Sequence, residues 1–119
     1  MKKEVKFKTD DTIVHVETAV LVALVTGNQT EEQTNEYLDE LEFLAETDCV
    51  KTLKRFTQKL AHPDNKTYVG KGKLEEVKTY TETHSVDLVI IDDELSPSQQ
   101  RNMEEAIKKR VLDRSMLIL

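Results

Sequence analysis

The stretch TAVLVALVT, residues 18–26, decides the fold of this chain. It is a nearly continuous run of aliphatic and β-branched residues, which is typical of a strand covered on both faces in a parallel sheet. The polar sequence Gly27-Asn28-Gln29 ends the run. A similar run, VDLVII at residues 86–91, predicts a second buried strand, and weaker strand patterns occupy residues 50–58 and 111–112.

Helical patterns separate the predicted strands. Thr30 and Gln33 form a capping box, which predicts a helix from there to about Thr47. Its apolar residues recur at spacings of three and four and should face the core; they are Leu38, Leu41, Leu44 and Ala45. A second helix is expected over residues 73–84, with Leu74 and Val77 facing inward.

A third helix should begin at Ser96-Pro97-Ser98-Gln99, which combines a capping box with proline at the first helical position. Met103, Ala106 and Ile107 should face the core. Strands and helices therefore alternate along the chain. This alternation predicts an α/β fold, with a parallel β-sheet of about four strands flanked by helices and joined by right-handed crossovers.

Length, charge and cysteine content limit the class of protein. The 119 residues suffice for one domain, and a net charge of -6 argues against general affinity for nucleic acid, so any RNA contact must be a local patch. The single cysteine, Cys49, excludes an internal disulfide framework; it is interpreted as a small buried apolar residue of a protein from a reducing cytosol. The longest apolar run, residues 19–25, is too short to span a membrane.

Charge is distributed unevenly along the chain. Residues 51–73 contain seven basic side chains and one acid, whereas residues 31–48 contain eight acids and no base. A phosphate-binding patch on an acidic domain would have this distribution, and so would an ordinary solvated loop. The loops at residues 27–29, 59–73 and 92–95 should share the carboxyl edge of the sheet, where such folds usually bind ligands.

Several separated blocks of sequence carry a family resemblance. They are TGNQTEE at residues 26–32, LDELEFLAET at 38–47, Gln58-Lys59, YVGKGK at 68–73, DELSPSQQRN at 93–102 and Asp113-Arg114. Together they resemble the N-terminal domain of the HflX family of ribosome-associated GTPases. The resemblance extends from Ala19 to the end of the chain, so residues 1–17 are interpreted as an N-terminal extension and residues 18–119 as the domain.

The resemblance implies a cytoplasmic translation factor that binds the large ribosomal subunit and splits or rescues stalled ribosomes under stress. In such proteins this domain precedes a helical hairpin and a GTP-binding domain that uses GTP and magnesium. The implied partners are therefore the large ribosomal subunit, its rRNA and the protein's own GTP-binding domain, with no membrane span. Because residues 116–119 are apolar and nothing terminates them, we expect a longer protein.

Polar residues in the three loops are the candidate RNA contacts. They are Asn28, Gln29, Lys59, Lys66, Lys71 and Lys73. Gly70 and Gly72 would let backbone N–H groups approach an anion at a helix start, although the turn alone could require them. If the site is real, an RNA phosphate is a better ligand than a free nucleotide.

Other chemistries have weaker support. Asp92-Asp93-Glu94 could hold Mg²⁺ as in receiver modules, but those modules also place acids after their first strand, where this chain has Gly27-Asn28-Gln29. These acids are therefore interpreted as orienting their loop. The three histidines, His15, His62 and His84, lack metal-ligand spacing, and no catalytic pair is evident. The alternative function is a stand-alone flavodoxin-like module for signalling or protein interaction.

We predict that this chain binds no GTP and has no catalytic residues or cofactor of its own. It contains no G-x-x-x-x-G-K-[ST] loop, and Gly70-Lys71-Gly72-Lys73 is too short and lacks the hydroxyl that holds Mg²⁺. The sequence Asn65-Lys66-Thr67-Tyr68 also lacks the aspartate that would recognise guanine. Calorimetric titration with GTP and Mg²⁺ should give no heat of binding; micromolar affinity would contradict the prediction.

Overall fold

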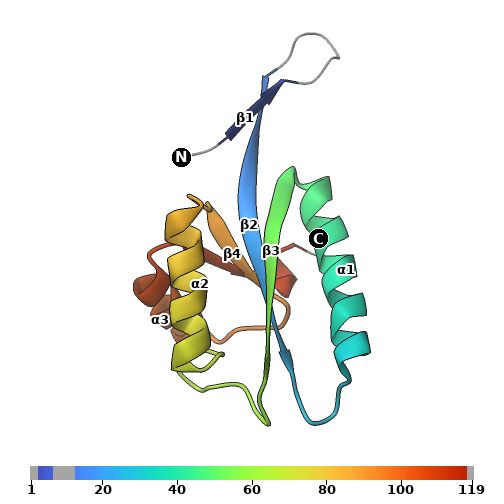
Figure 1. Ribbon diagram of the computed structural model, residues 1–119, viewed down its shortest axis with the longest axis vertical. Helices are drawn as coiled ribbons and strands as arrows, with labels where there is room; N and C mark the ends of the chain where they lie inside the picture. Colours follow the sequence, from blue (N-terminus) through green and yellow to red (C-terminus); the bar gives the residue numbers. More distant parts are fainter. Residues whose placement is uncertain (1–2, 7–12, 118–119) are drawn as a thin grey trace.

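A computed structural model describes residues 3–6 and 13–117 of the chain (Figure 1). The elements are β1 (Lys3–Lys6), β2 (Ile13–Val25), α1 (Glu31–Thr47), β3 (Val50–Lys59), α2 (Lys71–Thr83), β4 (Leu88–Ile91), α3 (Pro97–Ile107), β5 (Arg110–Asp113) and the short 3-10 helix η1 (Arg114–Met116). Parts of the expected N-terminal extension (residues 1–2 and 7–12) and of the apolar end (residues 118–119) lie outside the described residues.

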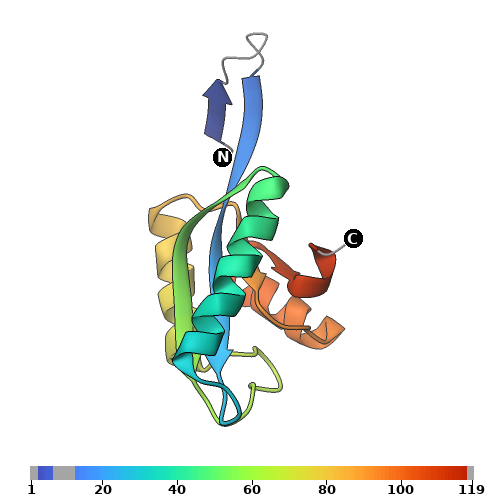
Figure 2. The same ribbon diagram turned by 90° about the vertical axis from the view of Figure 1, so that its right-hand side faces the viewer.

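Four parallel strands form the sheet in the order β3-β2-β4-β5, and β1 pairs antiparallel with the first residues of β2. Helix α1 covers one face, and α2 and α3 cover the other (Figures 1 and 2). The predicted α/β fold, with about four parallel strands flanked by helices, is confirmed.

Strand β2 lies at the centre because both of its faces are apolar. Val20, Val22 and Leu24 belong to the core beneath α2 and α3, whereas Ala19, Leu21 and Ala23 belong to the core beneath α1. Residues 19–22 are fully buried, as the continuous apolar run predicts. On the α1 side, the small side chains of Ala19 and Ala23 alternate with the larger Leu21.

The capping signals place two helix starts correctly. Thr30 with Gln33 and Ser96 with Gln99 both form complete capping boxes, so α1 and α3 begin where they are predicted to begin. Helix α2 instead begins at Lys71, two residues before the predicted start, with Gly70 as its N-cap. Gly70 and Gly72 have no side chain that could cap the helix, so the sequence carries no capping signal at the start of α2.

Three sequence-based details differ from the structure. The first strand begins at Ile13, before the expected residue 18, and β4 begins at Leu88 rather than residue 86. The prediction that Cys49 is buried is wrong, because its side chain is exposed. Cys49 has φ of 60° in the tight reversal between α1 and β3, which turns its side chain outward.

At the other end of the domain, Leu117 is buried against the α1-side core, as its apolar character suggests. None of the helices in the described ranges is long and apolar enough to cross a membrane.

Leu41 tests the assignment of the α1 core face. It is fully buried, so Leu41→Ala should lower the free energy of unfolding by about 2–5 kcal/mol in a urea melt. Phe43 on the same helix is 64% exposed, and Phe43→Ala should change stability by less than about 0.5 kcal/mol. Equal effects of the two substitutions would mean that the buried face is assigned incorrectly.

Candidate functional site

The strand order reverses beside β2, and this reversal creates a crevice. From β2 the chain crosses through α1 to β3 on one side, and β4 pairs with β2 on the other side after α2 has crossed the opposite face. The loops that follow β2 and β4 therefore diverge at the carboxyl edge, the usual ligand position in such sheets. A pocket of about 480 Å³ lies there, between these loops and the end of β5.

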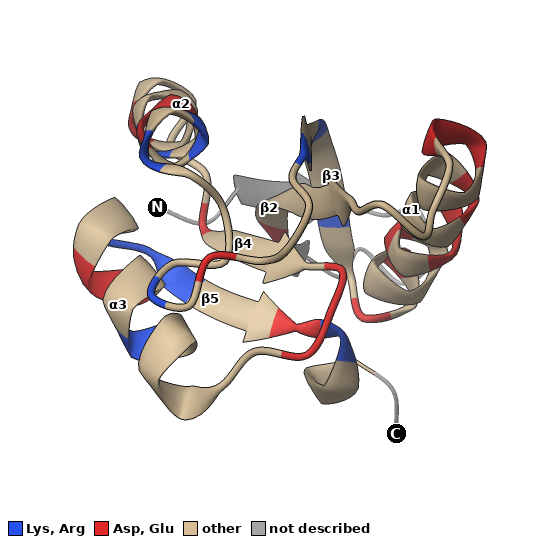
Figure 3. Ribbon diagram, turned by 90° about the horizontal axis from the view of Figure 1, so that it is seen from below, with Lys and Arg blue, Asp and Glu red and all other residues tan. Residues whose placement is uncertain are grey.

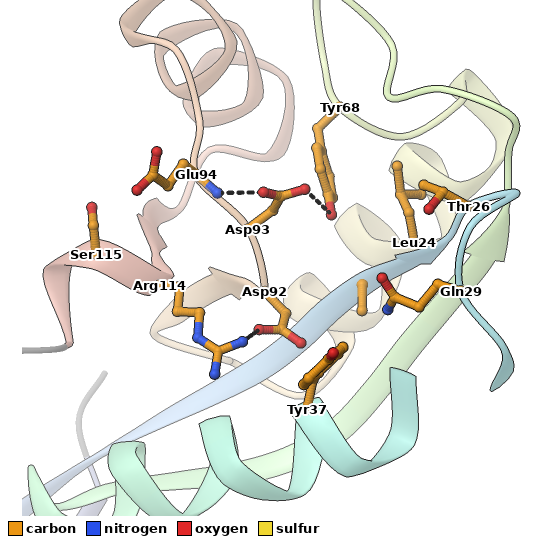
Figure 4. Close-up of a pocket in the computed structure, with 11 residues that line it drawn as sticks. Leu24, Thr26, Gln29, Tyr37, Tyr68, Asp92, Asp93, Glu94, Arg114 and Ser115 are labelled. Carbon is orange, nitrogen blue, oxygen red and sulfur yellow. Dashed lines mark hydrogen bonds and ion pairs between the residues drawn. The ribbon is translucent and has the colours of Figure 1, made fainter. Parts of the chain in front are cut away.

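Polar side chains from several elements line this pocket, which we call the switch-point pocket (Figure 4). The loop after β2 contributes Thr26 and Gln29, and the loop after β4 contributes Asp92, Asp93 and Glu94. Tyr37 of α1, Tyr68, Arg114 and Ser115 complete the polar lining. Residues far apart in the sequence thus meet at one edge of the sheet.

An ion pair between Asp92 and Arg114 forms the floor of the pocket. The Asp92 side chain is only 3% exposed, and Arg114 Nη1 lies 3.0 Å from its Oδ1. Arg114 Nη2 lies 3.1 Å from Glu40 Oε1, and its guanidinium lies 5.8 Å from the centre of the Tyr37 ring. Burial raises the pKa of Asp92, and the neighbouring Arg114 charge opposes that rise.

The second carboxylate oxygen of Asp92 is not used by the protein. Among the described residues, no group donates a hydrogen bond to Asp92 Oδ2, but this oxygen is open to solvent, since the one buried side-chain atom without a partner in this part of the chain is Thr52 Oγ1. In Figure 4 this oxygen lies on the side of Tyr37 and Gln29, within the pocket. The pocket therefore presents one carboxylate oxygen of Asp92 to solvent.

Tyr68 and Asp93 form the opposite wall. The Tyr68 hydroxyl donates to Asp93 Oδ2 at 3.4 Å, and the Glu94 N–H donates to Asp93 Oδ1 at 2.7 Å. Burial, and then the negative charges of Asp93 and Asp92, raise the pKa of Tyr68 far above its ordinary value. The phenol is therefore a neutral donor, which steadies the Asp93 carboxylate at the mouth of the pocket.

Side-chain bonds to the backbone brace the loops around the pocket. Asp113 accepts from the Leu95 N–H at 3.0 Å and from the Ser115 hydroxyl at 2.6 Å, which fixes the loop after β4 to the end of β5. In the neighbouring loop, Gln99 donates to the Asp64 carbonyl at 2.8 Å and Asn102 donates to the Lys66 carbonyl at 3.0 Å. Many of the residues that carry the family resemblance thus position loops.

The start of α2 lies beside these loops and carries positive charge. Its N-cap, Gly70, makes no side-chain capping bond, and its first turn contains Lys71 and Lys73 but no acid. Gln58 accepts from the Gly70 N–H at 2.9 Å, and a Cβ at Gly70 would lie 3.2 Å from the Gln58 amide nitrogen. Because first-turn N–H groups and the helix dipole attract anions, this helix start suits a phosphate better than the capped starts of α1 and α3.

The six candidate RNA contacts differ in availability. Lys66 and Lys71 are exposed and have no ion-pair partner among the described residues. Lys59 pairs with Glu31 at 3.2 Å, and Lys73 pairs with Glu76 at 3.0 Å.

The two uncharged candidates also differ. Asn28 is exposed, whereas the Gln29 amide donates to the Thr34 hydroxyl at 2.9 Å. Gln29 also lines the switch-point pocket.

The remaining positive charges of residues 51–73 do not join one patch. Arg55 is paired with Asp39 and Glu42, and Lys54 lies against the rings of Phe56 and Tyr80. In Figure 3, basic segments of β3 and α2 lie to one side of the acids at the ends of β4 and β5. The basic region is therefore a rim, which we call the lysine rim and define as Lys59, Lys66, Lys71 and Lys73.

The sequence did not predict which side chains meet in the switch-point pocket. Asp113-Arg114 is part of the family resemblance, but its pairing with Asp92 depends on the adjacency of β4 and β5. Nothing in the sequence marks Tyr37 and Tyr68 as pocket residues. Within residues 3–6 and 13–117, no group of three His, Cys, Asp or Glu side chains is arranged to hold a metal ion.

The geometry defines a class: an α/β domain with the first four strands of a flavodoxin-like order and a polar pocket at its switch point. Comparison with known families then identifies it. Residues 35–119 match the family described as "GTP-binding GTPase N-terminal", and the chain belongs to this family, the N-terminal domain of HflX GTPases.

Relatives and solved structures agree with this assignment. The chain is 45% identical to GTPase HflX of Flavobacterium psychrophilum over 89% of its own length and 26% of the relative, and 36% identical to that of Escherichia coli over 87% and 24%. A crystal structure of a variant of SsGBP has a TM-score of 0.64 at 26% identity, covering 87% of this chain and 30% of that one. The chain thus spans about a quarter of its curated relatives.

A GDP complex of a GTP-binding protein from the archaeon Sulfolobus solfataricus shares the fold, with a TM-score of 0.54 at 23% identity over 87% of this chain and 29% of that one. The family assignment favours the HflX interpretation over the stand-alone signalling module.

Arg114→Met tests the ion pair in the pocket. Leaving Asp92 buried without its partner should lower the free energy of unfolding at pH 7 by about 2–4 kcal/mol. Without Arg114, burial still raises the pKa of Asp92 above its unfolded value, so the native state binds the proton more tightly. Part of the loss should therefore return as the pH falls to about 5.

Urea melts of both proteins at the two pH values measure this difference. Adding Asp92→Asn to Arg114→Met should abolish the pH-dependent recovery, because the titrating carboxylate is then absent. A loss that is the same at both pH values in the single variant would show that Asp92 is not the group responsible.

Proposed function

We propose that this chain is the N-terminal domain of a GTPase that acts on the ribosome, and that the domain contacts rRNA of the large subunit through the lysine rim. The observation that carries the proposal is the pair of exposed lysines, Lys66 and Lys71, which have no ion-pair partner in the described part of the chain and lie beside the uncapped start of α2. The HflX resemblance supports the ribosome as the partner.

Electrostatics favours RNA phosphate at this rim. The first turn of α2 offers backbone N–H groups and the positive end of the helix dipole, and Lys71 adds a mobile ammonium group at the same position. Lys66 sits on a loop that Asn102 and Gln99 hold in place, so its backbone is already ordered before any contact forms. Contacts of this type bind the phosphate backbone and do not discriminate between bases.

The acids of the same edge limit where RNA can bind. Asp92 and Asp93 line the switch-point pocket, so a phosphate chain is repelled from this pocket and held at the rim. Binding of GTP and Mg²⁺, and the hydrolysis of GTP, belong in this proposal to the remainder of the protein. This domain would orient that GTP-binding domain on the ribosome in the cytoplasm.

The double variant Lys66→Gln/Lys71→Gln tests the RNA contact in the full-length protein. If each lysine neutralises one phosphate, the variant should bind large ribosomal subunits more weakly. The slope of log K against log salt should flatten by about two, which is roughly one unit per lost contact. Binding is measured by co-sedimentation over a range of salt concentrations, with the GTP analogue held constant.

The matched control is Lys51→Gln/Lys108→Gln. It removes the same charge from exposed positions at the opposite edge, where β3 begins and α3 ends, so the salt slope should not change. Unchanged affinity and slope in the Lys66/Lys71 variant would show that these lysines are solvated loop residues. An equal effect in both double variants would show a general charge effect without a defined contact.

A further inference from the structure

We infer that the open edge of the sheet at β3 binds an extended, acidic segment of a partner protein, which adds to the sheet as a further strand. The binding surface, which we call the β3 edge, consists of the outward backbone of Arg55, Thr57 and Lys59 and of the groove between β3 and α2. The inference does not depend on whether the domain binds RNA.

Strand β3 ends the row of strands, and in the described part of the chain no strand pairs with its outer side (Figure 3). The N–H of Leu60, just beyond β3, donates to the Val25 carbonyl of β2. Successive residues of a strand direct their N–H and C=O groups to opposite edges. The backbone groups of Lys59, Thr57 and Arg55 therefore face away from β2.

The opposite edge of the sheet, at β5, is closed by side chains of α3. Glu104 accepts from the Val111 N–H at 3.0 Å, and Gln100 donates to the Val111 carbonyl at 3.0 Å. Within residues 3–6 and 13–117, no side chain bonds in this way to the backbone of residues 55, 57 or 59. The protein thus occupies the outer backbone groups of one edge and leaves those of the other available as a template for an added strand.

A groove of about 500 Å³ lies between β3 and α2, beside this backbone. Phe56 is 5% exposed, and Tyr80 of α2 packs edge-on against it with ring centres 5.7 Å apart. His84 stacks on Tyr80 at 4.0 Å, and a Cβ at Gly72 would meet nothing within 4 Å, so the groove is open. Because alternate side chains of an added strand point to one face, an apolar side chain of the partner would lie in this groove.

Charge favours an acidic strand and opposes a second copy of this chain. Strand β3 contains four basic residues and no acid, so two copies paired edge to edge would oppose like charges. Arg55 and Lys59 already pair with acids of α1. Lys54 has no ion-pair partner among the described residues and lies 5.5 Å from the Phe56 ring and 5.4 Å from the Tyr80 ring. Lys54 can therefore pair with a carboxylate next to the side chain that enters the groove.

A capped eight-residue peptide tests the site. In this peptide threonine alternates with glutamate, and one central glutamate is replaced by valine. It is titrated into the 119-residue chain and followed by backbone amide shifts, which should saturate at Thr57, Lys59 and Thr79. A peptide with lysine in place of glutamate should bind at least about threefold more weakly. A peptide with proline in place of the central threonines should not bind, because it cannot form the backbone bonds.

Thr57→Pro tests the addition of a strand. Proline removes an outward N–H and keeps the bonds from β3 to β2, so the fold should persist while peptide affinity falls at least about tenfold. Thr57→Val is the matched control, because it keeps the N–H and removes only an exposed hydroxyl. Its affinity should stay within about twofold of the parent chain. Unchanged amide shifts in α1 and β4 show that each variant is folded.

Lys54→Glu leaves the outward backbone intact and reverses the charge beside the groove. It should reverse the order of affinity for the glutamate and lysine peptides, and an unchanged order would contradict the acidic specificity. The proposal is also overturned if no peptide shifts β3, or if the proline peptide binds as tightly as the parent peptide. Shifts of β3 that depend on protein concentration alone would identify a second copy as the occupant. Loss of peptide binding in the full-length protein would show that the rest of that protein covers the edge.

Discussion

The rest of the domain depends on the burial of β2 on both faces. A strand that is apolar on both sides must have a helix layer on each, so the crossover through α1 and the later crossover through α2 lie on opposite faces of the sheet. The loops that follow β2 and β4 must then run in opposite directions from the carboxyl edge of the sheet. The pocket follows from this geometry: the packing that stabilises the core also opens the crevice above it.

The crevice keeps its shape only if its loops are ordered. Side chains from neighbouring elements order them through hydrogen bonds to the loop backbone. Asp113 fixes the loop after β4, and Asn102 and Gln99 fix the loop before α2. Each bond joins a side chain to a backbone group of a loop, and so offsets part of the entropy lost on ordering that loop. The residues that carry the family resemblance are thus largely those that shape this edge, which makes the edge, rather than the sheet, the distinctive part of the domain.

Local patterns were sufficient for the fold but not for the pocket. The apolar run at residues 18–26 and the capping boxes at Thr30 and Ser96 depend on neighbours within four residues, so the sequence predicts them well. The pairing of Asp92 with Arg114 requires β4 and β5 to be adjacent, which no local pattern contains. Cys49 was misplaced for a related reason: its side-chain type favours burial, but the reversal that exposes it is a property of how α1 meets β3.

The lysine rim and the switch-point pocket lie at the same edge of the sheet, but different side chains hold them in place. Lys66 and Lys71 stand on segments held by Asn102 and Gln58, whereas the acids of the pocket follow β4 and are held by Asp113 and Arg114. At physiological ionic strength, exposed charges are screened over about 8 Å, so the rim responds to salt. The Asp92 side chain is almost fully buried beside Arg114, so this ion pair is screened much less. The carboxyl edge therefore combines a salt-sensitive basic rim with an acidic centre whose main ion pair is shielded from salt.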